Sequence, residues 1–129
     1  MSEAFGAYEE RLVNDLRKIL KAGKESTFLV VSAGDVYMQF LAMPGREEIY
    51  CEAVSNEFLP GKSRLSDSAV KQLREFGFAE PSGSPNFARV FVLAGDKDLT
   101  ALARLTFLIL SDIYGVAPDA ELQFNLTID

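Results

Sequence analysis

Apolar and polar residues alternate along the chain with two different periods, and the period changes at turn signals. Over Glu3–Ala22 apolar residues recur every three or four positions with charged residues between them, which predicts an amphipathic helix ended by Gly23. Three β-prone runs follow, Thr27–Ser32, Val36–Met43 and Glu48–Val54, separated by "AGD" and "PGRE". Short runs separated in this way predict an antiparallel meander.

The faces of these runs differ. The second run is apolar on both faces apart from Gln39, which suits a central strand, whereas the third alternates and should have one wetter face.

Further on, "LSDSAVKQLREFGF" predicts a short helix with marked ends. Ser66 is the expected N-cap, Gly77 the left-handed terminator, and Phe78 is expected to fold back on Leu73.

The stretch "SGSPNFARVF", Ser82 to Phe91, leads from a loop into a strand predicted over Phe87–Leu93. We interpret its beginning as a folding device. Pro85 fixes the turn, the side chain of Asn86 hydrogen-bonds to the backbone of the loop, and Phe87 anchors the returning strand in the core.

The last helix is predicted from Asp96, its expected N-cap, to Gly115, its expected stop. It is apolar nearly all round over Leu99–Ile113, so we expect it to be covered by its own sheet and by a second subunit. The final "ELQFNLTID" alternates strictly and predicts a strand whose core-facing residues are Leu122, Phe124, Leu126 and Ile128.

The predicted order of elements is α-β-β-β-α-β-α-β, in one domain over residues 1–129. Runs of strands followed by helices without a regular βαβ alternation favour the α+β class. We therefore expect an antiparallel sheet packed against helices on one face.

The composition narrows the classes of function. The 129 residues carry a net charge of −6, which disfavours binding to nucleic acid or to an anionic membrane surface. The chain has no histidine and one cysteine, so it lacks the commonest general base and any Cys–His pair. A single cysteine, no signal-peptide pattern and no long apolar run fit a cytoplasmic protein. We expect no catalytic residue, no metal and no cofactor.

Two charged motifs and one cysteine have structural explanations. Gly61-Lys62-Ser63 matches the tail of a phosphate-binding loop, but Asn56 stands where that motif needs glycine, so we predict a surface loop. Asp96 and Asp98 are first-turn carboxylates that complement a helix dipole, and not a calcium loop. Cys51 lies among apolar alternates and is expected to be an inert core residue.

Arg89 lies between Phe87 and Phe91 and has two interpretations. Its guanidinium group either stacks on an aromatic ring or pairs with a carboxylate of a partner. Alternatively, Arg89 has no such contact and is a solvated charge that keeps an edge strand from unwanted pairing. From the sequence we favour this solvated charge.

Four local pieces occur together in an arrangement that resembles the TY-Chap/YbjN-like family. They are the Leu65-Ser66-Asp67 opening, the Leu73…Gly77 ending, "SPNF" at 84–87 and Ile113-Tyr114-Gly115. That family is related in fold to the class I chaperones of bacterial type III secretion, and the resemblance covers nearly the whole chain. It implies a small acidic cytoplasmic protein, typically a homodimer, that holds another polypeptide on apolar grooves or sheet edges.

The leading prediction is therefore a non-enzymatic, chaperone-like module that binds a protein or peptide partner and forms a homodimer. We expect the partner or dimer interface to involve the 66–76 helix and the 87–93 strand, with these candidate residues: Val70, Leu73, Phe87, Arg89 and Phe91. One alternative is a regulatory or immunity-type protein that blocks one specific partner. Another is a small-ligand binder or an enzyme that uses carboxylates in a pocket between helix and sheet.

Overall fold

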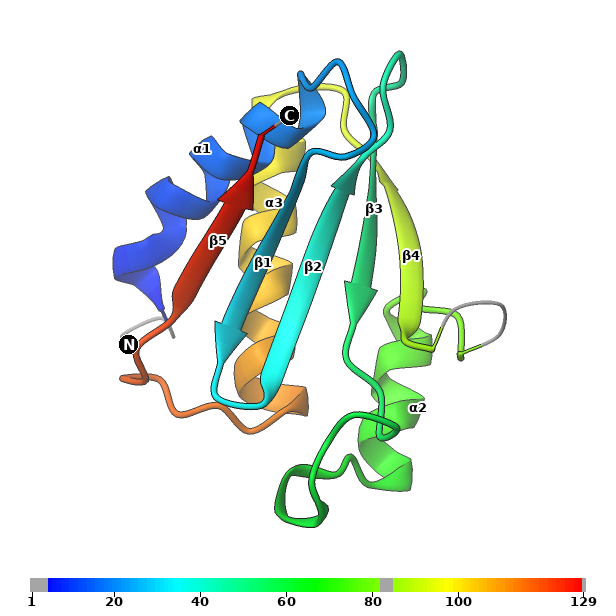
Figure 1. Cartoon of the computed structure of the whole chain (residues 1–129). Coiled ribbons are helices and arrows are strands. Elements are labelled where there is room, and N and C mark those ends of the chain that lie inside the picture. Colours follow the sequence, from blue (N-terminus) through cyan, green and yellow to red (C-terminus); the bar gives the residue numbers. More distant parts are fainter. Residues whose placement is uncertain (1–4, 82–84, 129) are drawn as a thin grey trace.

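The computed structural model describes residues 5–81 and 85–128, and its centre is one five-stranded antiparallel sheet (Figure 1). The strands lie in the order β4-β3-β2-β1-β5. Their bounds are β1 Phe28–Ala33, β2 Val36–Ala42, β3 Glu48–Ala53, β4 Phe87–Val92 and β5 Gln123–Thr127. The predicted meander is confirmed, β2 is the central strand, and β4 and β5 are the two edges.

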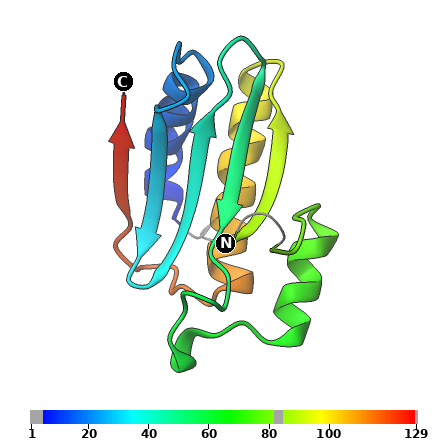
Figure 2. The same ribbon diagram turned by 45° about the vertical axis from the view of Figure 1, so that its right-hand side comes forward.

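The helices lie on one side of the sheet. The longer ones are α1 (Glu9–Leu20) and α3 (Asp96–Leu108), which pack against each other and cover one face, whereas no described helix covers the other face (Figures 1 and 2). The shorter α2 (Asp67–Glu75) lies beside the beginning of β4 and contacts η3 (Ile109–Ile113), the π-helical turn that continues α3. The α+β class and the predicted element order are confirmed, with the 3₁₀ turns η1 (Gly6–Tyr8) and η2 (Gly61–Ser63) added.

The alternation of side chains along each strand explains why one face carries the core. Cross-strand pairing sets Leu29 opposite Phe40 and Phe40 opposite Cys51, and all three side chains are buried under the helices. The neighbouring positions face the other way and are half-buried, and on β3 these are the predicted wetter positions Glu48, Tyr50 and Glu52.

The first helix is shorter than predicted at both ends. It begins at Glu9 because Phe5 adopts a left-handed backbone conformation (φ 64°) and turns its ring onto Phe107, with a centroid separation of 5.8 Å. Residues 1–4 lie outside the described part of the chain. At the other end the N–H groups of Lys21 and Ala22 close the last turn on preceding carbonyls. The helix therefore ends before Gly23, which is not left-handed, so the predicted role of Gly23 was wrong.

Both ends of α2 are as predicted. The Ser66 hydroxyl accepts a hydrogen bond from the Ala69 N–H at 3.1 Å. Gly77 is left-handed (φ 86°), and the Phe78 N–H donates to the Leu73 carbonyl at 3.1 Å. Together with the bond from the Gly77 N–H to the Arg74 carbonyl, this forms a Schellman motif.

The predicted ends of α3 and β5 need two corrections. Gly95, and not Asp96, is the N-cap of α3, because its backbone is still extended and its carbonyl accepts the first helical hydrogen bond, from the Leu99 N–H at 3.3 Å. Gly115 is left-handed (φ 72°), as expected of a stop. Ile128 is 63% exposed and not in the core, because the pairing between β1 and β5 ends at Thr127.

Candidate functional site

Strand β4 is an edge strand whose outer side is largely unpaired. The Leu93 N–H donates to the Glu47 carbonyl at 2.7 Å, which fixes the phase of the β3–β4 ladder. In an antiparallel ladder the backbone groups of alternate residues aim to opposite sides. The N–H and C=O groups of Val90 and Val92 therefore aim outward, away from β3.

One short segment pairs with the beginning of this edge. Ala79 exchanges two backbone hydrogen bonds with Ala88, at 2.8 and 3.1 Å. In residues 5–81 and 85–128 no strand pairs with the outer side of β4 beyond that bridge. The side chains of Val90 and Val92 are 41% and 67% exposed. The result is a short backbone edge with two exposed valines.

An uncovered stripe of α3 faces this edge and α2. Ala101, Leu105 and Leu108 recur along it at helical spacing, Asp112 continues it in η3, and all four are exposed or half-buried. A first hollow of about 220 Å³ lies where the stripe meets β4. Its lining residues are Arg89, Phe91, Val92, Leu93, Asp98, Ala101, Leu102 and Leu105.

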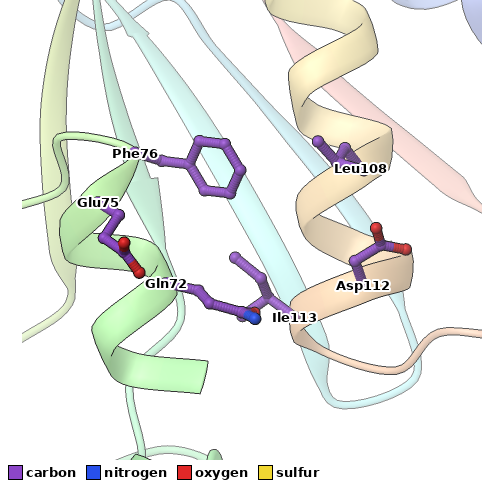
Figure 3. A pocket seen from close by; sticks show the side chains of 6 residues that line it. All are labelled: Gln72, Glu75, Phe76, Leu108, Asp112 and Ile113. Atoms are coloured by element: carbon purple, nitrogen blue, oxygen red, sulfur yellow. The ribbon is translucent and has the colours of Figure 1, made fainter. Parts of the chain in front are cut away.

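A second hollow of about 250 Å³ lies farther along the same stripe, between α2 and the end of α3 (Figure 3). Phe76 on α2 and Leu108 on α3 point toward each other across it, above Ile113. Glu75 and Asp112 lie on opposite walls, and Gln72 completes the lining. The π-helical turn η3, closed by a bond from the Tyr114 N–H to the Ile109 carbonyl at 3.1 Å, carries two of these residues.

Arg89 connects β4 to α2 and lies at the boundary of the two hollows. It pairs across the sheet with Cys51 and so points to the helix side. Its guanidinium group donates to the carbonyl of Phe76, the C-cap of α2, and lies 4.3 Å from the centroid of the Phe91 ring. A Cβ atom at Gly77 would lie 3.2 Å from the Arg89 side chain. The stacking interpretation is confirmed, and the favoured interpretation, a solvated charge, was wrong.

In the described part of the "SPNF" stretch Phe87 is anchored in the core as predicted, whereas the Asn86 side chain bonds to residues of other segments; Ser84 lies outside the described residues. The Asn86 side chain accepts from the Ser55 N–H at 3.1 Å and donates to the Tyr37 hydroxyl at 3.1 Å. The Ser55 hydroxyl donates to the Pro85 carbonyl at 2.6 Å. Phe87 is buried, with 4% of its surface exposed. These contacts orient the start of β4.

The candidate interface residues lie at different depths. Leu73, Phe87 and Phe91 are buried in the core of the single chain, whereas Val70 and Arg89 are half-buried. Their part in an interface stays a prediction. The exposed residues of β4, Val90 and Val92, were missed, although Ala88, Val90 and Val92 form one fully apolar alternating set in the run "ARVFV".

The open face of the sheet carries an apolar row that ends at the same edge. Cross-strand pairing aligns Phe28 with Leu41, Leu41 with Tyr50, and Tyr50 with Val90. The first three side chains are half-buried. Apolar surface therefore extends across four strands to β4.

Cys51 and Tyr114 are buried groups with raised pKa values, and Gly61–Ser63 lies at the surface. Cys51 is fully buried, as predicted, and burial raises the pKa of its thiol. Burial also raises the pKa of Tyr114, whose hydroxyl donates to the Val54 carbonyl at 2.6 Å. Gly61–Ser63 forms a short 3₁₀ turn whose Gly61 and Lys62 are exposed. Among the described residues there is no cluster of three acidic, Cys or His side chains that could hold a metal ion, and no helix long and apolar enough to cross a membrane.

A comparison with protein families gives one match. The family model TY-Chap3, described as "T3SS (YopN, CesT) and YbjN peptide-binding chaperone 3", matches residues 4–127 and confirms the resemblance seen in the sequence. No curated protein and no solved structure matches the chain. The matched span includes β4, α2, α3 and both hollows.

Proposed function

Because the chain belongs to the TY-Chap3 family of peptide-binding chaperones, we propose that it holds an extended segment of a partner polypeptide along the outer edge of β4. The family supports a non-enzymatic, protein-binding role of the chaperone type. The observation that carries the proposal is the pair of outward-aimed N–H and C=O groups at Val90 and Val92. An extended segment can pair with them as a sixth strand.

The surroundings of the edge favour such a strand. Its side chains would alternate between the two faces of the sheet. On the helix side they would reach the first hollow, with Phe91 and Leu105 in its lining. On the open side they would extend the apolar row that ends at Val90. Backbone pairing would thus hold the segment, and the two apolar surfaces would select its side chains.

A proline on the edge tests the proposal. Val90→Pro removes an outward N–H but no bond to β3, so the sheet should still form. Val90→Ala is the matched control, because it shortens the side chain and keeps the N–H. We expect Val90→Pro to reduce the affinity for the partner about tenfold, the loss of roughly one backbone hydrogen bond, and Val90→Ala less than about threefold.

The partner for this test comes from a pull-down from the native host with mass spectrometry, and affinity is then measured with peptides tiled along the captured protein. Unchanged affinity of Val90→Pro for a peptide that binds the wild type would contradict strand addition. Capture of one protein only would favour the alternative, a regulatory or immunity-type protein that blocks one specific partner.

Self-association belongs to the same proposal. A homodimer through α2 and β4 would cover the exposed valines in the absence of a partner, and a biological interface of this kind buries at least about 1,000 Å² in total. Sedimentation of the wild type and of Val90→Pro at tens of micromolar tests it. If the wild type sediments only as a monomer, the homodimer proposal is wrong, whereas the proposal of partner binding is unaffected.

The alternative of a small-ligand binder or carboxylate enzyme has less support. The two hollows have volumes of about 220 and 250 Å³, below the roughly 300–1,000 Å³ typical of ligand pockets. Both are bounded by an exposed stripe of α3. Shallow neighbouring hollows of this size suit single side chains of a peptide.

A further inference from the structure

The two hollows beside α3 differ in charge. The first has one basic and one acidic residue in its lining, Arg89 and Asp98. The second has two acidic residues, Glu75 and Asp112, and no basic residue among the described residues that line it. The whole chain is acidic as well, with a net charge of −6. The second hollow therefore favours a cation.

The rest of the second lining suits the stem of a long side chain. Phe76 and Leu108 face each other across it and Ile113 lies below, so methylene groups between them would lose contact with water (Figure 3). Lysine and arginine bury an aliphatic stem in this way and keep the charged end at a polar rim. Gln72, in the same lining, offers an amide oxygen as a further acceptor.

The two carboxylates, of Glu75 and Asp112, belong to different helices. Glu75 is the last residue of α2, whose end is fixed by the Schellman motif and by Arg89. Asp112 lies in the π-helical turn and its carboxylate accepts from the Ser111 hydroxyl at 3.1 Å. Two negative groups thus border one hollow from its two sides.

We propose that the second hollow selects a lysine or arginine side chain of the partner segment, with its stem between Phe76 and Leu108 and its charge between Glu75 and Asp112. The inference rests on the proposed function, since the segment that pairs with β4 would supply the side chain. It narrows the partner to a segment that carries a basic residue among apolar ones.

The test uses four fluorescein-labelled peptides of the sequence GSSVLVXVLVSSG, in which X is lysine, arginine, norleucine or glutamate. Norleucine has the stem without the charge. We expect the lysine and arginine peptides to bind the wild type about threefold to tenfold more tightly than the norleucine peptide, in line with two partly exposed ion pairs. At about 0.5 M salt this ratio should fall toward one, because exposed charges are screened.

Variants assign the effect to the hollow. Glu75→Gln with Asp112→Asn should bind the lysine and norleucine peptides equally, and Glu75→Lys with Asp112→Lys should prefer the glutamate peptide. The matched control is Asp119→Asn with Glu121→Gln, two exposed acids outside the lining, which should keep the wild-type preference. All four positions are exposed, so the variants should fold normally.

The outcomes separate this inference from the proposed function. If the wild type binds the lysine and norleucine peptides equally well, or if the control variant loses the preference as the hollow variant does, the inference is wrong and peptide binding stands. If none of the four peptides binds saturably, both fail. Reversal of the preference in the double-lysine variant supports both, since a merely structural role of the carboxylates does not exchange lysine for glutamate.

Discussion

The two edge strands of the sheet are built differently. On β5 the residues of the open face are polar, namely Gln123, Asn125 and Thr127, and on the helix face Tyr8 packs on Phe124 with a centroid separation of 5.6 Å. On β4 the residues of the open face are apolar, namely Ala88, Val90 and Val92. Polar residues protect an edge from association, whereas apolar ones invite it. The contrast supports the proposal that β4 is the edge that meets a partner.

Each edge is nevertheless held to a helix by an arginine over a phenylalanine. Arg11, on α1, lies 4.6 Å from the centroid of Phe124, and its partner carboxylate is Asp15 at 4.0 Å. Arg89, on β4 itself, stacks on Phe91 and is tied to a backbone carbonyl of α2. The side chain of Arg11 is 58% exposed, whereas Arg89 is half-buried. We therefore expect the β4 attachment to be the stronger of the two.

The largest expected difference between the edges is in their phenylalanines. Phe87→Ala removes a buried ring and should lower the free energy of unfolding by about 3–5 kcal/mol. Phe124→Ala, on β5, removes a half-buried ring and should cost about 1–2 kcal/mol, since less apolar surface returns to water. Denaturant melts measure both. Similar midpoints for the two variants would remove the distinction in core packing between the edges.

The two arginines give an intermediate effect. Arg89→Ala loses a charged hydrogen bond and a ring contact and should lower the free energy of unfolding by about 1–2 kcal/mol. Arg11→Ala should change it by no more than about 0.5 kcal/mol, because the Arg11 side chain is 58% exposed and lies a long 4.0 Å from the Asp15 carboxylate. The same melts test this pair. A larger loss for Arg11→Ala than for Arg89→Ala would reverse the assignment of the stronger attachment.

The smallest expected effect is a difference in pH dependence. Burial raises the pKa of Asp15 above the ordinary 3.8, although Arg11 opposes the rise. The folded chain thus takes up this proton at a higher pH than the unfolded chain. The free energy of unfolding of the wild type, relative to that of Asp15→Asn, should therefore be highest below pH 3.8 and fall as the pH rises through the raised pKa.

Melts of both proteins at about pH 4 and about pH 7 measure this difference. The β4 attachment ends on a backbone carbonyl, which does not titrate, so the cost of Arg89→Ala should be the same at both values. A cost that changes with pH would show that a titrating group takes part in the β4 attachment.

Local chemistry accounts for the parts of the fold that the sequence predicted. Ser66 and Gly77 form their bonds with residues nearby in sequence, and the alternation in β2 and β3 reflects one covered and one open face. The family resemblance rested on these same pieces. Such features need little knowledge of the rest of the molecule.

The site depends on contacts between distant elements, which single-sequence patterns do not encode. Arg89 received the wrong interpretation because its acceptor, the Phe76 carbonyl, exists only once α2 packs beside β4. The second hollow needs the π-helical turn, which neither glycine nor proline marks within Ile109–Ile113. The prediction that Ile128 faces the core was wrong because alternation alone does not show where the neighbouring strand ends.

Cys51 gives the chain a built-in reporter of strand motion. It is the only cysteine, it is fully buried, and it lies on β3 directly opposite Arg89 of β4. A thiol reagent can react with it only in molecules that have opened, so the rate of labelling measures how often that part of the sheet separates. A partner strand that adds to β4 would slow the reaction without touching the sulfur. The decrease in the labelling rate would then measure how much binding raises the free energy of local opening.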